Sequence, residues 1–439
     1  MITKKDKKLA QWTMNYALKN GCQAVRITVF NGSSNSIEVR DMKIDRLQQA
    51  SEYSLMIRLY VNGRYGSYST NRFEKNELKK TIIEWIQATG FLCPDEARTL
   101  PDASLYYKGN NEDLCLFDET YEKIDPDKRI EIAMNVCDEM MGKDTRLISA
   151  NSSYSDDQVF KYMITSNGFE GEASETSFGI SASANIRGLG ESRPEAFWYD
   201  SKVFLKDLET KGIGLEALKR AQQKIGQRKA VSGQYHMLVD NMNSARLLSP
   251  IINALYGSSI QQKNSFLMNC IDKKILSDKV RLRDTPHLPK AFGSRYFDGE
   301  GIATHDRDIF EEGILKTYFI DTYSSNKLTI PPTISGPSVL SVDKGTRPLN
   351  TILTDLDKGI LVTGFNGGNC NSTSGDFSYG VEGFLIEKGE LSHPISEMNI
   401  TGNILNLFKN VQEIGNDPKD SSSWKIPSLL FDKVNFSGL

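Results

Sequence analysis

The stretch that decides the fold of the C-terminal half is residues 359–417, GILVTGFNGGNCNSTSGDFSYGVEGFLIEKGELSHPISEMNITGNILNLFKNVQEIGND. Apolar and polar residues alternate along much of it, as they do in β-strands with one buried face. Glycines recur within this alternation, which predicts turns, bulges or another backbone passing close by. The stretch therefore predicts a β-rich domain with an edge or groove for an extended peptide bound through main-chain hydrogen bonds.

A hairpin is expected at its centre, where Phe384 and Ile386 alternate before a turn at Lys388-Gly389. Just upstream, glycines that admit a close backbone and residues that offer apolar or hydrogen-bonding contact are candidates for lining the peptide groove. These candidates are Asp376, Phe377, Ser378, Tyr379, Gly380 and Gly383. The alternative is a loop-rich β-domain that uses glycine only where the backbone needs a positive φ, with Asp376 and Ser378 as turn formers.

The same segment resembles the C-terminal signature of a known family. The blocks that carry the resemblance are Gly375–Gly380, Gly383-Phe384, Glu387–Glu390, Pro394–Glu397 and, upstream, Asn264–Leu267, Phe297–Gly301 and Tyr323–Leu328. In this order they resemble the TldD/PmbA family, long described as modulators of DNA gyrase. The resemblance is strong over residues 235–439 and more diffuse before them.

The resemblance implies a metallopeptidase, but this chain departs from the pattern that carries the chemistry. In the catalytic branch of the family, a helix with an H-E-x-x-x-H pattern places two imidazoles on one face for zinc. The corresponding segment here, residues 245–257, contains neither histidine nor glutamate, and Pro250 is expected to end or kink the helix. The chain therefore resembles the zinc-free PmbA (TldE) branch, and zinc is expected only in a TldD-like partner.

No other pattern in the sequence supplies a catalytic centre. The four histidines (His236, His287, His305 and His393) are isolated from one another, and no phosphate-binding loop or nucleophile elbow is present. Cys370 lies in the glycine-rich segment, but a thiol nucleophile needs a base within reach, and the sequence places none beside it. We therefore predict no catalytic, metal-binding or cofactor-binding residues in this chain.

Composition narrows the partners. The 439 residues include 53 Lys and Arg against 56 Asp and Glu, so no overall charge favours nucleic acid or an anionic membrane. No apolar run approaches the length of a membrane span or a signal peptide core. The six cysteines are scattered without a C-x-x-C pair, which is typical of reduced thiols. We expect a soluble, cytoplasmic protein.

The N-terminal half predicts helices packed on one face of a sheet. The run Lys4–Lys8 and the apolar residues that follow it predict a first helix, which ends at Gly21. Strands are expected on both sides of turns at Asn31-Gly32 and Asn62-Gly63. A helical stripe then ends at Gly90.

Further along, Asp125 is expected to cap a second long helix, with Pro126 at its first position. Strands follow as far as Phe204, and a helix before Gly226 ends the first half. The fold class predicted is α+β, with an N-terminal α+β domain at residues 1–228 and a β-rich, sandwich-like or barrel-like domain at residues 229–439.

Three functions are compatible with these features. The first is a non-catalytic subunit that binds or positions an extended peptide for a zinc-bearing TldD-like partner, in peptide maturation or degradation. The second is a homo-oligomer, such as a homodimer, that binds peptides without enzymatic activity. The third is an autonomous hydrolase with an unrecognised site. Direct action on gyrase or nucleic acid is disfavoured, because the charge is balanced and no basic-aromatic stripe is present.

Overall fold

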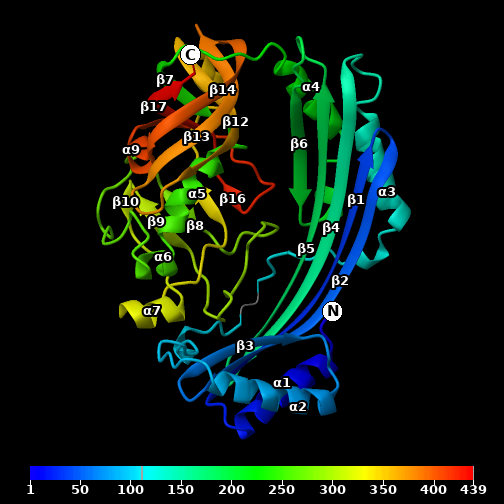
Figure 1. The fold of residues 1–439 in the computed structure, drawn as a ribbon, viewed down its shortest axis with the longest axis vertical. Helices are drawn as coiled ribbons and strands as arrows, with labels where there is room; N and C mark the ends of the chain where they lie inside the picture. Colours follow the sequence, from blue (N-terminus) through cyan, green and yellow to red (C-terminus); the bar gives the residue numbers. More distant parts are fainter. Residues whose placement is uncertain (110–111, 439) are drawn as a thin grey trace.

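The computed structural model describes residues 1–109 and 112–438. It contains an N-terminal sheet covered by helices and a C-terminal part built around a barrel (Figure 1). The predicted α+β class, with a barrel-like C-terminal domain, is confirmed. The boundary that we predict between residues 228 and 229 lies in the segment joining helix α4 (Ile213–Gln223) to strand β7 (Gly233–Val239).

The N-terminal sheet has six antiparallel strands in the order β3-β2-β1-β4-β5-β6. Their bounds are Ala24–Arg40 (β1), Lys43–Val61 (β2), Arg64–Thr70 (β3), Leu147–Thr165 (β4), Glu170–Ile186 (β5) and Glu195–Lys202 (β6). Strands β1, β2, β4 and β5 are long and curve along the height of the molecule, and β6 is the edge strand that faces the barrel (Figure 1).

Four helices cover one face of this sheet, as the sequence predicts: α1 (Lys4–Lys19), α2 (Lys75–Gly90), α3 (Pro126–Asp138) and α4. On β1, Val25, Ile27 and Val29 lie in the core beneath α1 and α2, whereas Ile37 and Val39 lie in the core beneath α3 and α4. All these positions are odd-numbered, and side chains two residues apart on a strand share a face. The opposite face of the sheet is turned toward the C-terminal part.

The turn predicted at Asn31-Gly32 is wrong. Strand β1 continues through it, and Gly32 pairs with Glu52 on one side and Val159 on the other. Neither residue has a positive φ, which the tight hairpin turn would need at both positions. The chain instead turns at Asp41 and Met42, whose φ angles are 47° and 62°. Two complete ladders of hydrogen bonds outweigh the local preference of the dipeptide.

Two other predicted turns are confirmed. Asn62 and Gly63 join β2 to β3 with φ angles of 50° and 71°. Lys388 and Gly389, with angles of 53° and 77°, join β13 (Asp376–Glu387) to β14 (Glu390–Asn403). The predicted cap at Asp125 also forms, because its side chain accepts a hydrogen bond from the Asp127 N–H.

The C-terminal barrel has five strands in the order β14-β13-β12-β7-β17, and it closes because β14 also pairs with β17. Besides β7, its strands are β12 (Lys358–Cys370), β13 (Asp376–Glu387), β14 (Glu390–Asn403) and β17 (Leu429–Ser437), and β15 (Val411–Ile414) extends β17. Its core also contains Leu247 and Ile251 from helix α5 (Ser244–Ala254). Pro250 lies inside α5, which continues past it to Ala254, so the expected break does not occur.

A second small sheet, in the order β10-β9-β8-β11-β16, accompanies the barrel. It consists of β8 (Leu282–Asp284), β9 (Arg307–Glu311), β10 (Ile314–Leu315), β11 (Leu340–Val342) and β16 (Trp424–Lys425). The remaining helices are α6 (Gly257–Gln261), α7 (Thr322–Leu328), α8 (Leu349–Thr354) and α9 (Ile404–Lys409). Of the helices in residues 1–109 and 112–438, none combines the length and the apolar character needed to cross a membrane.

Candidate functional site

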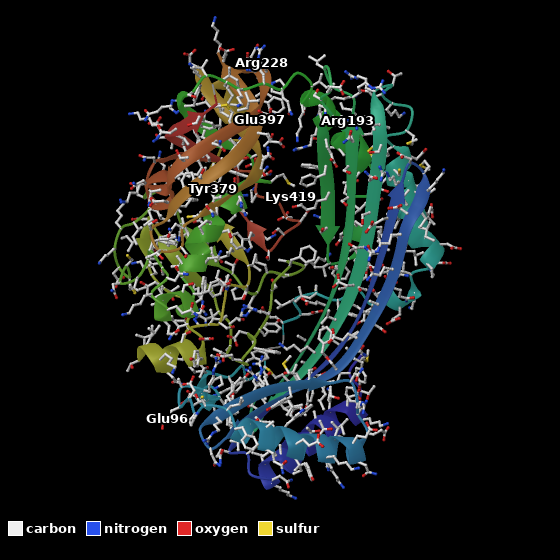
Figure 2. All side chains as sticks on the ribbon, viewed as in Figure 1. Glu96, Arg193, Arg228, Tyr379, Glu397 and Lys419 are labelled. Carbon is white, nitrogen blue, oxygen red and sulfur yellow. The ribbon has the colours of Figure 1, made fainter. Side chains whose placement is uncertain are left out.

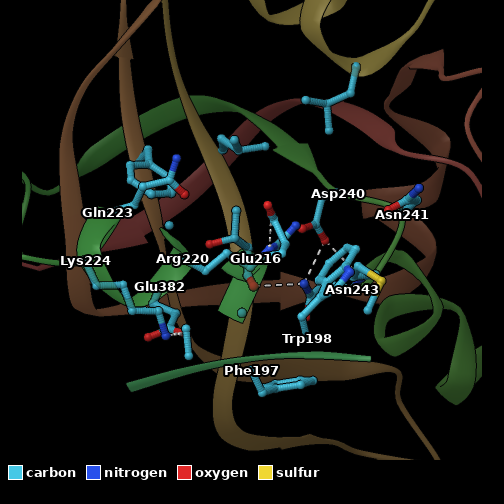
Figure 3. A pocket seen from close by; sticks show the side chains of 18 of the residues that line it. Phe197, Trp198, Glu216, Arg220, Gln223, Lys224, Asp240, Asn241, Asn243 and Glu382 are labelled. Carbon is cyan, nitrogen blue, oxygen red and sulfur yellow. Dashed lines mark hydrogen bonds and ion pairs between the residues drawn. The ribbon is translucent and has the colours of Figure 1, made fainter. Parts of the chain in front are cut away.

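A pocket of about 620 Å³ lies between the N-terminal sheet and the barrel (Figure 3). One wall comes from β6 and α4, and the other from the loop after β7 and from β12 and β13. The volume is in the range typical of ligand sites. Its lining residues combine aromatic rings, amide groups, cations and carboxylates, and they include no histidine, cysteine or serine.

The N-terminal wall is built around Trp198 of β6. The Arg220 guanidinium of α4 lies 4.0 Å from the centre of the Trp198 ring system, and the Lys419 ammonium lies 4.4 Å from it. The same ammonium is 3.8 Å from the centre of the Tyr199 ring. Cations are attracted to aromatic faces by the ring quadrupole, so these contacts hold the wall and both cations in place.

The side chain of Lys419 extends from the C-terminal part of the molecule and contacts the N-terminal sheet. It belongs to the loop between β15 and β16, and Figure 2 shows it between the barrel and the sheet. Its Nζ donates a hydrogen bond to the Tyr199 carbonyl at 3.0 Å. Burial lowers the pKa of Lys419 to about 8, although the nearby Asp200 carboxylate acts in the opposite direction. The ammonium is therefore a partly desolvated charge near neutral pH.

The cations that line the pocket each contact a carboxylate. Lys224 forms an ion pair of 2.6 Å with Glu382 and so joins the end of α4 to the barrel. Arg220 and Lys219 each contact Glu216, at 2.9 Å and 3.3 Å. Within the described part of the chain, no ion pair includes Lys419. Lys419, which stacks on Trp198 and Tyr199 beside the pocket, thus differs from the lining cations.

The barrel wall carries a buried carboxyl group. Asp240 follows β7 directly and is 7% exposed. Asn243 donates to it from its side chain at 2.7 Å, and also donates to the Thr363 carbonyl at 2.9 Å. Burial raises the pKa of Asp240, opposed by the bond from Asn243. This network fixes the loop after β7 against the bulged part of β12.

The six predicted groove residues lie on β13 but do not share one surface. Phe377 and Tyr379 are 5% and 2% exposed, and their rings stack on each other inside the barrel core. Asp376 and Ser378 point the opposite way and are exposed, and Asp376 accepts hydrogen bonds from Asn403 and Ser374. The two aromatic rings therefore contribute packing rather than exposed contact area.

Both glycines in this set are required by the backbone around them. A Cβ on Gly383 would lie 1.8 Å from the Leu361 carbonyl oxygen, and one on Gly380 would lie 2.6 Å from that of Asn366. Gly383 also lines the pocket between the two halves. Of the six predicted residues, Gly383 is the one that reaches this pocket.

A smaller pocket, of about 230 Å³, lies where α5 faces the glycine-rich end of β12. Arg246, Ser249, Asn253, Cys370 and Tyr379 contribute to its walls. Burial raises the pKa of the Cys370 thiol, and the Asp376 charge raises it further. The thiol donates weakly to its neighbouring backbone carbonyl. These surroundings oppose formation of the thiolate that nucleophilic chemistry needs.

Three models of PmbA/TldA metallopeptidase domains match the sequence: domain 1 at residues 26–84, the central domain at residues 119–225 and the C-terminal domain at residues 232–438. Together they cover most of the chain. The chain belongs to the PmbA/TldA metallopeptidase family.

Proteins that align with this chain over nearly its whole length support the family assignment. A *Haemophilus influenzae* protein described as a metalloprotease PmbA homolog is 27% identical, with 97% of this chain and 95% of that protein aligned. The crystal structure of a *Bacteroides thetaiotaomicron* protein described as a modulator of DNA gyrase is 56% identical, with both chains fully covered and a TM-score of 0.98. TldE from *Thermococcus kodakarensis* shares the fold, with a TM-score of 0.87 at 20% identity over 98% of this chain and all of that one.

Membership of a metallopeptidase family raises the question whether this member's residues fit a zinc ion. Around the smaller pocket, the donor set is a thiol with a raised pKa, a serine and an asparagine, beside the Arg246 guanidinium. Zinc sites in proteins use thiolate, imidazole and carboxylate ligands. No group of three or more His, Cys, Asp or Glu residues in the described ranges is placed to hold a metal. Among the residues that line the smaller pocket, only Cys370 is of these ligand types.

Sequence reasoning did not find the main site of this PmbA/TldA family member. Trp198, Arg220, Lys224 and Asp240 line the pocket, and Lys419 lies beside it. They come from distant parts of the chain, and no two of them form a recognisable motif. The one usable signal was the run Phe197-Trp198-Tyr199, three aromatic residues on a short edge strand. Exposed aromatic residues gather at binding surfaces.

Proposed function

We propose that this protein is a non-catalytic subunit that binds and positions an extended peptide for a zinc-bearing, TldD-like partner. The observation that carries the proposal is the pocket between the two halves, which offers aromatic, hydrogen-bonding and cationic groups. Membership of a metallopeptidase family supports a role in proteolysis. The donor set that does not fit zinc favours a division of labour with a second subunit.

Two further parts of the proposal rest on the sequence. We propose that the assembly is an oligomer, and that it works in the cytoplasm on maturing or labile peptides. The scattered cysteines support a reducing compartment, since all six are free thiols here. The balanced charge supports a peptide rather than a nucleic acid as ligand.

The test is reconstitution. The full-length chain and a TldD-like partner with an intact H-E-x-x-x-H motif are assayed separately and as a mixture, with a fluorogenic peptide and with added zinc. We expect cleavage by the mixture that exceeds the sum of the separate rates. Zinc-dependent cleavage by this chain alone would contradict the proposal. So would a mixture no faster than the partner by itself, with no complex on size-exclusion chromatography.

A further inference from the structure

The edge of β6 that faces the pocket carries backbone groups that its own sheet does not use. The Ile186 N–H donates to the Pro194 carbonyl, and the register pairs Ala184 with Ala196. In an antiparallel pair, residues alternate between those that bond the neighbouring strand and those that do not. The even-numbered residues of β6 therefore bond β5, and the odd-numbered residues direct their N–H and C=O groups to the free side.

Two lysines confirm this direction and delimit the open part of the edge. The Lys224 ammonium donates to the Glu195 carbonyl at 2.8 Å, and the Lys419 ammonium donates to the Tyr199 carbonyl at 3.0 Å. Between these two bonds lie the N–H and C=O of Phe197 and the N–H of Tyr199. These three groups have no hydrogen-bond partner among the described residues.

The surroundings limit what can cover this edge. Phe197 and Tyr199 line the pocket of about 620 Å³, and its opposite wall is the barrel of the same chain. Neighbouring strands in a sheet lie only 4.7–4.9 Å apart, so a single extended chain needs little width. A pocket of this volume accepts a short extended peptide but not a folded domain.

The charges indicate a property of that peptide. Lys419 uses one of its three donors on the Tyr199 carbonyl. It lies beside the pocket, against the Trp198 and Tyr199 rings, and no ion pair of the described residues includes it. An ammonium held at the end of the open edge and partly removed from water gains most from an anionic hydrogen-bond partner. The complementary group is a carboxylate at the matching end of the peptide.

We propose that an extended peptide binds in this pocket as an added strand on the free edge of β6, and that Lys419 binds a carboxylate of that peptide. The carboxylate is either the C-terminus or an Asp or Glu side chain. This inference rests on the proposed peptide-binding function, and it adds the mode of binding and the class of peptide.

The backbone part is tested with two variants of the full-length protein. Phe197→Pro removes the free N–H, and proline is tolerated where the N–H of an edge strand faces away from the sheet. Phe197→Val keeps the N–H and removes the ring, so it is the matched control. Fluorescence anisotropy with a labelled eight-residue acidic peptide should show Kd raised on the order of tenfold by Phe197→Pro. Phe197→Val measures the contribution of the ring alone, which is 62% exposed, and a Kd for Phe197→Pro no higher than that for Phe197→Val would overturn strand addition.

Peptide chemistry tests the same point without changing the protein. Backbone N-methylation of alternate residues should weaken binding when it removes amides that face β6, and have little effect in the other register. This measurement decides the matter if Phe197→Pro does not fold by circular dichroism. Equal effects of the two methylation registers would overturn strand addition.

The carboxylate part is tested with Lys419→Met and four peptides, in which the C-terminus is a carboxylate or an amide and an internal residue is Glu or Gln. We expect the wild type to prefer one carboxylate by roughly three- to tenfold, and Lys419→Met to lose that preference. The carboxylate that Lys419 binds is then identified as the one, C-terminal or internal, whose replacement by a neutral amide weakens binding to the wild type. A preference that survives in Lys419→Met would overturn this part.

These outcomes separate the inference from the proposed function. Peptide binding that is indifferent to Phe197→Pro, Lys419→Met and N-methylation would overturn the inference and leave a peptide-binding subunit. Stimulation of the partner without any peptide binding by this chain would overturn the inference as well. The inference would also be overturned if Phe197→Pro and Lys419→Met both left the cleavage rate of the mixture and the peptide affinity of this chain unchanged.

Discussion

At the residue scale, the glycines of β13 are needed because neighbouring backbone occupies the space that a side chain would fill. Gly383 lies where β12 and β13 shift register, and the Leu361 carbonyl occupies the place of its missing side chain. Gly380 is similarly close to Asn366. The position of each glycine is therefore explained by barrel closure, whether or not a peptide also passes near it.

Gly383→Val should destabilise the barrel by about 2 kcal/mol or more, because overpacking against backbone cannot be relieved by a rotamer change. Urea unfolding followed by circular dichroism measures this. Gly90→Val is the control, because nothing lies within 4 Å of a Cβ at Gly90 and it should change stability by less than about 1 kcal/mol. Unchanged stability of Gly383→Val together with lost peptide processing would instead assign the glycine to the groove.

Asp156 is a second residue whose role is structural. It is 1% exposed and accepts hydrogen bonds from Arg129 at 2.5 Å, Tyr121 at 2.7 Å and Tyr154 at 2.8 Å. Together these groups satisfy a charge buried between α3 and the sheet. A buried pair whose partners are all present is stable, whereas removing one partner leaves an uncompensated charge.

Asp156→Ala should therefore lower the free energy of unfolding by roughly 3–5 kcal/mol. Thermal or urea unfolding checks this, and Asp45→Ala on the exposed part of β2 should change stability by no more than about 0.5 kcal/mol. A small effect of Asp156→Ala would mean that water replaces the carboxylate and that the network contributes little.

At the element scale, α5 is the helix where the family resemblance places zinc ligands in the catalytic branch, and residues 245–257 contain no histidine or glutamate. Ser249 and Asn253 lie one helical turn apart and both line the smaller pocket with Cys370. Pro250 does not disrupt this presentation, because the helix continues past it. Its buried face, which includes Leu247 and Ile251, packs into the barrel core and compensates for the missing hydrogen bond.

The double variant Ser249→His, Asn253→His should not cleave peptides, even with added zinc. The helix carries no glutamate to activate a zinc-bound water, and the Arg246 guanidinium repels a cation in the same pocket. Elemental analysis and a fluorogenic peptide assay of the purified variant check this. Zinc-dependent cleavage would show that the site is nearly intact and that our view of its divergence is wrong.

At the scale of the whole molecule, the contact between the two halves creates the larger pocket. Lys224–Glu382, Lys419–Tyr199 and Ser421–Asp200 join the N-terminal sheet to the C-terminal part around it. Lys419 lies near charged groups from several elements. These groups are Asp200 and Lys202 of β6, Arg220 of α4 and Asp240 after β7.

This arrangement predicts a pH dependence of binding. The pKa of Lys419 is lowered to about 8, so the side chain is charged below that pH and neutral above it. The preference for a carboxylate peptide over its amide should therefore be present at pH 7 and fall as the pH rises through about 8, or somewhat higher because the bound carboxylate raises the lysine pKa. Anisotropy titrations from pH 6.5 to 9.5 measure it. The preference should be flat across this range in Lys419→Met, and a flat wild-type profile would contradict the assignment.

The sequence by itself determined the features that depend on neighbours along the chain. The cap at Asp125, the turns at Asn62-Gly63 and Lys388-Gly389, and the α+β class with a β-rich end follow from local preferences and periodicity. Specific family blocks predicted the family. The absence of histidine from residues 245–257 was also visible, because the two histidines of the family motif would lie on successive turns of one helix.

Only the tertiary structure decided what depends on distant segments. It carried β1 through Asn31-Gly32, because two neighbouring ladders outweigh one dipeptide. It buried Phe377 and Tyr379, since a closed barrel has an interior that alternation alone cannot assign to a side. It also brought Lys419 to a strand edge 220 residues earlier in the chain. Such a contact arises from the packing of two cores, and no local pattern of residues encodes it.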